Sequence, residues 1–215
     1  AAACSGDSPQ AQMEEANPEM ESGGTLNYIP WSPLRTRDPL NEESWQSDEG
    51  LVYDNLLRLD GQGAVSPSIG QSWTMQADGK TWIIDIRTDM KFHDGTDLTV
   101  DDVVFSINTV MEKRYRPYTR EIRTVTGARA IDEDTVEITT KVIDSMIPQK
   151  MYYQFVVSKA HYEGLGTETE AFSQNPLGSG PYKWVSWVQG TGWEVERTAE
   201  DHAWRPANFD RIVAT

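Results

Sequence analysis

The chain is poor in the residues that build disulfides and metal centres. It holds one cysteine, Cys4, and three histidines, His93, His161 and His202. A single cysteine excludes an internal disulfide and any site made of several thiolates. The histidines are far apart in the sequence, and none has the spacing to another histidine or to a carboxylate that is typical of a zinc site. We therefore expect no metal and no cofactor.

Basic residues and long apolar runs are also scarce. The 19 Lys and Arg residues stand against 34 Asp and Glu residues, which gives a formal net charge of −15. This balance argues against nucleic acid as a partner, because phosphates attract Lys and Arg. No apolar run is long enough to span a bilayer. The 215 residues have ample length for one large domain or two small ones.

No residue pattern indicates an enzyme. Gly178-Ser179-Gly180 lacks the G-x-S-x-G spacing of a nucleophile elbow, and a tight turn before Pro181 explains it better. The paired acids Asp101-Asp102 suit the start of a helix. His93, next to the turn dipeptide Asp94-Gly95, is expected to be a structural hydrogen-bonding residue rather than a base. The eight Trp and eight Tyr are many for this length, and most are expected in the core.

Turn residues and apolar spacing predict hairpins mixed with helices. The clearest helix begins after Thr99, an N-cap residue to which Asp102 can reach back. We expect helices over residues 100–111, 145–153 and 158–162, and another that begins after Ser44 or Ser47 and runs to about residue 59. We expect strands at 25–29 and 155–157, and hairpins at 72–87, 125–142 and 182–197. Helices mixed with hairpins predict the α+β or mixed α/β class.

The motifs along the chain are more specific than this pattern. Those that carry a resemblance are Gly23–Leu26, Asp38-Pro39, Val52–Leu57, Ser72-Trp73, Lys91–Thr96, Leu98-Thr99, Asp102–Ser106, Asn175–Tyr182 and Phe209–Val213. In this order they closely resemble the family 5 extracellular solute-binding proteins, the peptide- and nickel-type binding proteins of ABC importers. The resemblance covers nearly everything after Ser22.

The resemblance implies a mixed α/β, two-lobed fold of the class II periplasmic-binding-protein type, whose first lobe carries an inserted smaller domain. Residues 23–43 and 146–215 would form the main part of lobe I, left incomplete, and residues 44–145 would form the inserted domain. Family members are more than twice as long, so the chain is interpreted as an N-terminal fragment without the second lobe.

The resemblance also implies a function and a site. The chain would belong to the component that captures short peptides, or a related small solute, outside the cytoplasmic membrane and delivers it to ABC permease subunits. Nickel complexes, opines and oligosaccharides remain open as ligands. Glu42 or Glu43 could meet the amino terminus of a peptide. The positions that map onto ligand-binding segments are Tyr28, Trp31, Glu42, Glu43, Trp45, Tyr118, Tyr152 and Tyr153.

A second hypothesis from another class is a single-lobe carbohydrate-binding or hydrolase module that uses surface Trp residues. It differs in architecture, because a capture protein closes two lobes on one ligand. Each candidate aromatic residue also has an ordinary explanation as a core ring.

The N-terminal residues predict a membrane anchor. Ala1-Ala2-Ala3-Cys4 resembles the end of a lipoprotein signal peptide, in which the cysteine receives lipid, although Ala1 stands where Leu is usual. Residues 5–22 have almost nothing to bury, so residues 1–22 are expected to be a signal-peptide remnant and a disordered tether. The expected location is the periplasm or cell surface, with the protein lipid-anchored to a bacterial membrane.

Overall fold

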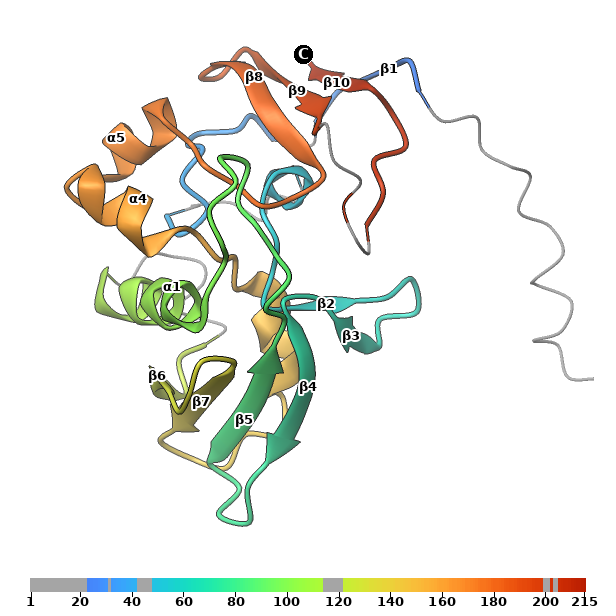
Figure 1. The fold of residues 1–215 in the computed structure, drawn as a ribbon. Helices are drawn as coiled ribbons and strands as arrows, with labels where there is room; N and C mark the ends of the chain where they lie inside the picture. Colours follow the sequence, from blue (N-terminus) through green and yellow to red (C-terminus); the bar gives the residue numbers. More distant parts are fainter. Residues whose placement is uncertain (1–22, 31, 42–47, 114–121, 199–201, 203–204) are drawn as a thin grey trace, which may run out of the picture.

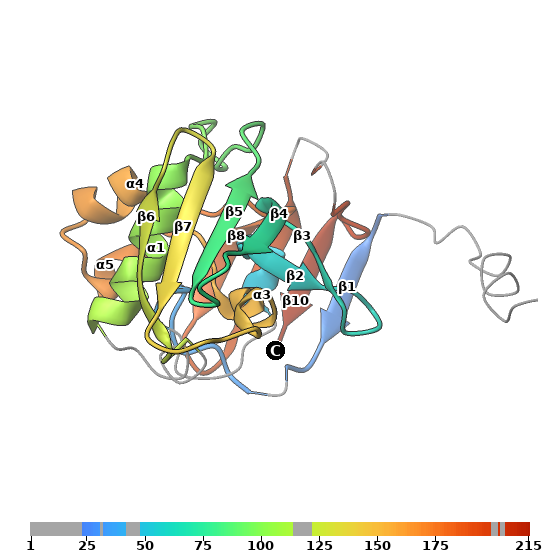
Figure 2. The ribbon, with the colours of Figure 1, turned by 90° about the horizontal axis from the view of Figure 1, so that it is seen from below.

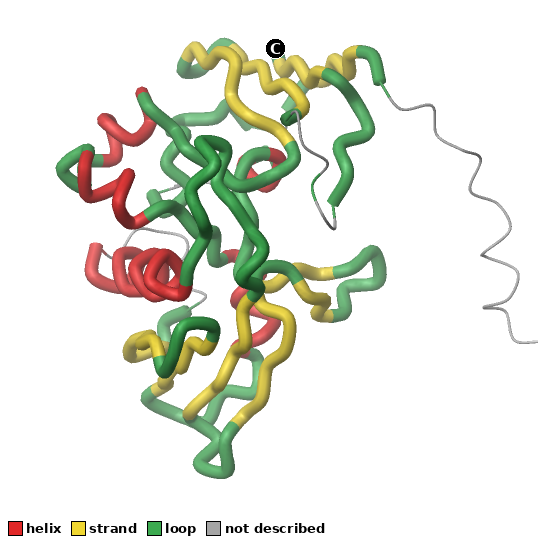
Figure 3. Tube along the Cα trace, in the orientation of Figure 1, coloured by secondary structure: helices red, strands yellow, loops and turns green. Residues whose placement is uncertain are grey.

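The computed structural model describes residues 23–30, 32–41, 48–113, 122–198, 202 and 205–215. Within them the chain forms two four-stranded sheets at opposite ends of the molecule, with helices α1, α4 and α5 grouped on one side (Figure 1). Figure 3 shows that long loops occupy the region between the sheets. None of the helices in the described ranges has both the length and the apolar character that crossing a membrane requires.

The first sheet, which we call the terminal sheet, joins the two ends of the described chain. It consists of β1 (Thr25–Tyr28), β10 (Arg211–Ala214), β9 (Gly192–Arg197) and β8 (Tyr182–Val188), in that spatial order. β1 and β10 are parallel, and the other neighbours are antiparallel. The hairpin predicted over residues 182–197 is confirmed. A register shift between Trp184 and Ser186 interrupts β8, and Trp184 and Trp187 are both half-buried.

The second sheet, the central sheet, is antiparallel throughout. Its order is β4 (Gly70–Met75), β5 (Thr81–Ile86), β7 (Thr135–Thr140) and β6 (Val125–Ala130). Both hairpins predicted here are confirmed. Trp82, Ile84 and Ile86 alternate along β5 and are all buried, as the period of two requires.

Helix α1 (Val100–Lys113) covers one face of the central sheet, and Figure 2 shows it behind β6 and β7. Val103, Ile107 and Val110 form its buried stripe, as the helical spacing predicted. At its start, the Thr99 amide and hydroxyl both donate to Asp102 Oδ2 at 2.8 Å. The expected return contact of the capping box is therefore present.

The predicted helix that ends near residue 59 is wrong over its described part. Only a 3-10 turn, η2 (Glu49–Leu51), precedes β2 (Leu57–Leu59), which pairs with β3 (Val65–Pro67). The Leu56 amide donates to Gln154 O at 2.8 Å, and the Leu56 carbonyl accepts from Gly70 N at 2.7 Å. Because these backbone groups form hydrogen bonds with distant segments, they are satisfied without the hydrogen bonds of a helix.

The later helices agree in part with the prediction. Residues 145–153 form α3 (Ile147–Lys150) and a 3-10 turn, η3 (Met151–Tyr153), and the strand expected at 155–157 is only one bridge, between Asn55 and Phe155. Ser158 Oγ accepts from His161 N at the start of α4 (Lys159–Gly164), as predicted. Helix α5 (Thr169–Gln174) was not predicted.

Candidate functional site

The turn that contains His93 is bound to the loop 178–181 through both the backbone and the ring of His93. His93 N donates to Gly178 O at 2.8 Å, and His93 Nε2 lies 2.8 Å from Gly180 O. Burial lowers the pKa of His93, because the charged ring would lose its hydration, and the Gly180 carbonyl opposes this only in part. The ring is thus the structural hydrogen-bonding group that the sequence predicted.

The two glycines of this loop are required by close packing. Gly180 N donates to Val52 O at 2.8 Å, and a Cβ at Gly180 would lie 2.8 Å from Leu51 O. A Cβ at Gly178 would press directly on Val52 O. Three of the motifs that carry the family resemblance therefore meet here, backbone against backbone.

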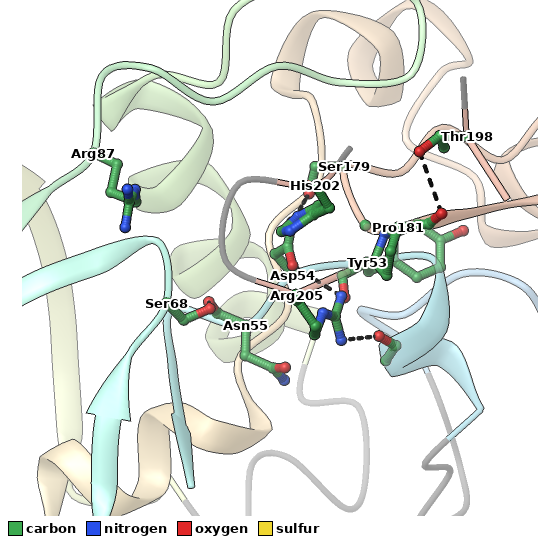
Figure 4. A network of polar contacts seen from close by, with 12 residues as sticks. Tyr53, Asp54, Asn55, Ser68, Arg87, Ser179, Pro181, Thr198, His202 and Arg205 are labelled. Carbon is green, nitrogen blue, oxygen red and sulfur yellow. Dashed lines mark hydrogen bonds and ion pairs between the residues drawn. The ribbon is translucent and has the colours of Figure 1, made fainter. Parts of the chain in front are cut away.

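The buried carboxylate of Asp54 links the same region to His202 and Arg205, near the end of the described chain. The Asp54 side chain is fully buried and accepts from Arg205 Nη2 at 2.9 Å, His202 Nε2 at 3.0 Å and Ser179 Oγ at 2.9 Å (Figure 4). Arg205 also donates to the backbone carbonyls of Gly50 and Tyr53. The network joins segments from three parts of the sequence.

The partners of Asp54 decide its charge. Burial by itself would raise the pKa of this carboxyl. The hydrogen bonds from His202 and Ser179, together with the positive charge of Arg205, outweigh burial and hold the pKa of Asp54 below its usual range. Asp54 is therefore a buried anion paired with the Arg205 guanidinium.

The described part of this network does not have the geometry of a hydrolytic triad. Ser179 Oγ and His202 Nε2 both bind Asp54 Oδ2, so the serine hydroxyl donates to the acid and not to the imidazole. A hydrolytic triad needs the histidine between serine and acid. Over the described ranges, no group of three or more His, Cys, Asp and Glu residues is placed to hold a metal ion.

Of the predicted ligand-binding residues, the described part of the chain contains Tyr28, Tyr152 and Tyr153. Tyr28 is half-buried, and its hydroxyl donates to Asp48 Oδ1 at 2.5 Å. Burial, the larger cause, and this hydrogen bond both raise the pKa of Tyr28. Tyr152 is 36% exposed, and its ring centroid lies 5.1 Å from that of Tyr153. The other predicted residues lie outside the described residues: Cys4, Trp31, Glu42, Glu43, Trp45 and Tyr118.

Tyr28 and the tyrosine pair occupy different parts of the molecule. Tyr28 ends β1 in the terminal sheet and packs edge-on against Trp193, with ring centroids 5.6 Å apart. Tyr152 and Tyr153 are in η3, which packs against β2. Figure 1 shows β1 and β2 well separated, so Tyr28 and the pair do not form one cluster.

A cavity of about 240 Å³ lies beside the end of β1. Ile29, Pro30, Leu34, Trp187 and Trp193 contribute to its mainly apolar lining. These residues come from two segments that are distant in the sequence. The sequence analysis pointed to Tyr28 and Trp31 on the first segment but named none of these five residues. The high Trp content was the available signal, but it could not distinguish cavity rings from core rings.

The fold is that of the class II periplasmic binding proteins. The structure superposes on OppA from Burkholderia pseudomallei with a TM-score of 0.77 and 24% sequence identity, covering 89% of this chain and 42% of that one. DppA from Helicobacter pylori, solved with the peptide STSA, gives a TM-score of 0.77 at 21% identity and covers 91% and 43% of the two chains. NikZ from Campylobacter jejuni, solved with Ni(L-His), gives 0.75 at 23% identity, covering 91% and 39%.

The family follows from the sequence match. The profile of the bacterial extracellular solute-binding proteins, family 5 (middle), matches residues 64–215, which is more than half of the chain, and the chain belongs to this family. Glutathione-binding protein GsiB of Escherichia coli K12 is 27% identical over 187 residues, covering 84% of this chain and 34% of the relative. The nickel-binding periplasmic protein of the same strain is 26% identical over 153 residues, covering 67% and 29%. The chain thus spans about a third of the length of these relatives.

Proposed function

We propose that this chain is part of the substrate-capture component of an ABC importer and that it works outside the cytoplasmic membrane. The observation that carries this proposal is membership of the family of extracellular solute-binding proteins over residues 64–215. The named relatives are binding proteins, which supports a binding role rather than catalysis. ABC permease subunits would then be its partners.

Short peptides are the ligand class that we propose. GsiB is named for glutathione, itself a short peptide, and DppA was solved with a tetrapeptide. NikZ with Ni(L-His) and AgaA from Agrobacterium with agropinic acid show that other solutes fit the same fold. We assign the amino terminus of the peptide to Glu42 or Glu43, because a carboxylate in a closed cleft stabilises an ammonium group far better than one in water.

The proposed organisation follows the division expected from the sequence. Residues 23–43 and 146–215 would form the main part of the first lobe, and residues 44–145 the inserted domain. The terminal sheet draws its strands only from the former ranges, and the central sheet draws its strands only from the latter, which supports the division.

Calorimetric titration with a pool of di- to pentapeptides tests the proposed ligand class. We expect peptides with a free amino terminus to bind, and we expect N-acetylated versions of the same peptides to bind at least roughly tenfold more weakly, because they lack the charge that the carboxylate would meet. The double variant Glu42→Gln/Glu43→Gln should lose the preference for the free amine. Glu133→Gln, an exposed acid in the turn between β6 and β7, is the matched control.

Two results would contradict the proposal. If no peptide of the pool binds the protein, the ligand class is wrong. If free and acetylated peptides bind equally, Glu42 and Glu43 do not receive the amino terminus. Oligosaccharides titrated in parallel test the alternative hypothesis of a single-lobe carbohydrate-binding module. No contact among the described residues supports that alternative.

A further inference from the structure

Hydrogen bonds made by its backbone hold Arg37 in place. Its amide donates to Ser173 Oγ at 3.1 Å, and its carbonyl accepts from the Tyr53 hydroxyl at 2.6 Å. The neighbouring residues Thr36 and Asp38 are buried. The backbone at Arg37 is therefore fixed by hydrogen bonds to two distant segments.

The guanidinium of Arg37 rests on two tryptophan rings. Its Cζ lies 5.2 Å from the ring centroid of Trp187 and 6.0 Å from that of Trp184. Its Nε atom is buried and makes no hydrogen bond to any described residue. Trp187 Nε1 donates to Leu34 O at 3.3 Å, which fixes the orientation of one of the two rings.

Arg37 and Arg205 are both half-buried, but they differ in their anionic partners. Arg205 is paired with Asp54 at 2.9 Å, whereas among the described residues no carboxylate forms an ion pair with Arg37. Burial lowers the pKa of Arg37, which reports the same cost of an uncompensated charge.

The ring contacts do not replace an anionic partner. A cation–π contact contributes about 0.5–2 kcal/mol and leaves the in-plane N–H donors of the guanidinium unused. Those donors form a planar fork that matches the two oxygens of a carboxylate. An Arg stacked on aromatic rings is also pre-organised, so little side-chain entropy is lost when an anion binds.

A mainly apolar cavity borders one of the two residues that support this cation, Trp187, whereas Arg37 and Trp184 are not part of its lining. The Trp187 ring that supports Arg37 also lines the cavity of about 240 Å³ beside β1, together with Ile29 and Trp193. Ile29 is 84% exposed and Val188, at the same cavity, is 61% exposed. In the part of the chain that the structure describes, the buried Nε1 atom of Trp193 has no hydrogen-bond partner.

We propose that Arg37, Trp184 and Trp187 bind the carboxylate of a small organic acid, whose apolar part enters the cavity beside Trp187. All of the residues that build this site are in the described ranges. The inference does not rest on the importer function, because it requires neither the peptide-binding residues Glu42 and Glu43 nor a second lobe.

N-acetyl-leucine is a suitable probe, because it carries one carboxylate and one branched apolar side chain. We expect it to quench Trp fluorescence saturably and to shift the Arg37 Nε–Hε signal in NMR spectra. N-acetyl-leucinamide, which lacks the charge, should bind at least roughly tenfold more weakly. Acetate, which lacks the apolar group, should also bind at least roughly tenfold more weakly than N-acetyl-leucine.

Variants distinguish the specific role of the Arg37 guanidinium from a general effect of removing one positive charge. Arg37→Gln should lower the affinity for N-acetyl-leucine at least roughly tenfold and leave the weak affinity for the amide unchanged. Arg129→Gln removes an exposed arginine that is paired with Glu137 at 2.6 Å, and it should bind like the parent. Arg37→Lys keeps the charge without the fork, and serves as the second variant if Arg37→Gln does not fold.

Three results would overturn the inference. The first is the absence of saturable binding of N-acetyl-leucine to the parent protein. The second is equal binding of the acid and the amide. The third is a folded Arg37 variant, either Gln or Lys, that binds the acid as the parent does. Equal binding of acetate and N-acetyl-leucine would remove the cavity from the site.

Discussion

At the scale of single residues, Asp54 is a fully buried carboxylate with three polar partners. Replacing it with Asn would leave the Arg205 guanidinium without its anion and weaken the bonds from His202 and Ser179. We expect Asp54→Asn to lower the free energy of unfolding at pH 7 by about 3–5 kcal/mol, the usual cost of removing one partner of a buried ion pair. Urea unfolding measures this value.

The same residue predicts a pH dependence. Because the pKa of Asp54 is lowered in the folded state, its contribution to stability is present above the unfolded pKa of about 3.9 and is lost as the pH falls through the lower folded value. The fall in stability between neutral and strongly acidic pH should therefore be smaller in Asp54→Asn than in the parent.

A matched variant tests whether burial is the cause. Asp60 is exposed and its Oδ1 accepts from the amides of Gln62 and Ala64, bonds that an Asn side chain can also accept. Asp60→Asn should leave both the stability and its pH dependence nearly unchanged. An equal loss in the two variants would mean that the Asp54 network adds nothing beyond an ordinary turn.

At the scale of elements, the contact between the loop 178–181 and Val52 predicts a steric effect. Gly178→Ala places a Cβ against the Val52 carbonyl, so we expect a destabilisation of about 1–3 kcal/mol. Gly61→Ala adds a Cβ in open space and is the control. Thermal unfolding of the two variants gives the comparison, and equal midpoints would show that the loop moves away without cost.

Gly95, in the turn before α1, predicts a different kind of cost. Its φ is 86° and a Cβ there would meet nothing within 4 Å, so strain comes from the backbone alone. Gly95→Val should destabilise by about 1–3 kcal/mol, because a β-branched residue is strained at positive φ. Chemical denaturation measures the loss. Unchanged stability would mean that the turn has an alternative conformation of equal energy.

How much of the fold was predictable depended on where each element finds its hydrogen bonds. Helix α1 and the three hairpins carry local signals, and they were predicted. The segment around Leu56 has helical apolar spacing, yet its backbone bonds to Gln154 and Gly70, and no local pattern contains that information. Helix α5 was not predicted, because its six residues bury only Phe172 and Ser173.

The candidate sites show the same limit at a larger scale. Tyr28, Tyr152 and Tyr153 could be named because they map onto ligand-binding segments of the resembled family, and their contact with a ligand is a proposal. The cation of Arg37, which has no ion pair with a described carboxylate, could not be found in the sequence, because Trp184 and Trp187 reach it only after β8 joins the terminal sheet. Long-range packing, and not residue type, creates that site.

At the scale of the whole molecule, the last prediction concerns the membrane. Under the proposed importer function, Cys4 would receive lipid, and residues 5–22 would tether the binding lobes to the membrane surface. Stable anchoring requires more than one acyl chain, because a single chain binds only reversibly. We therefore expect diacylated Cys4 in the native host, and Cys4→Ser should move the protein from the membrane fraction to the aqueous fraction. Ser5→Ala, one residue away, should stay with the membranes. An unmodified Cys4 thiol in mass spectra, or a Cys4→Ser variant that fractionates like the parent, would refute the anchor.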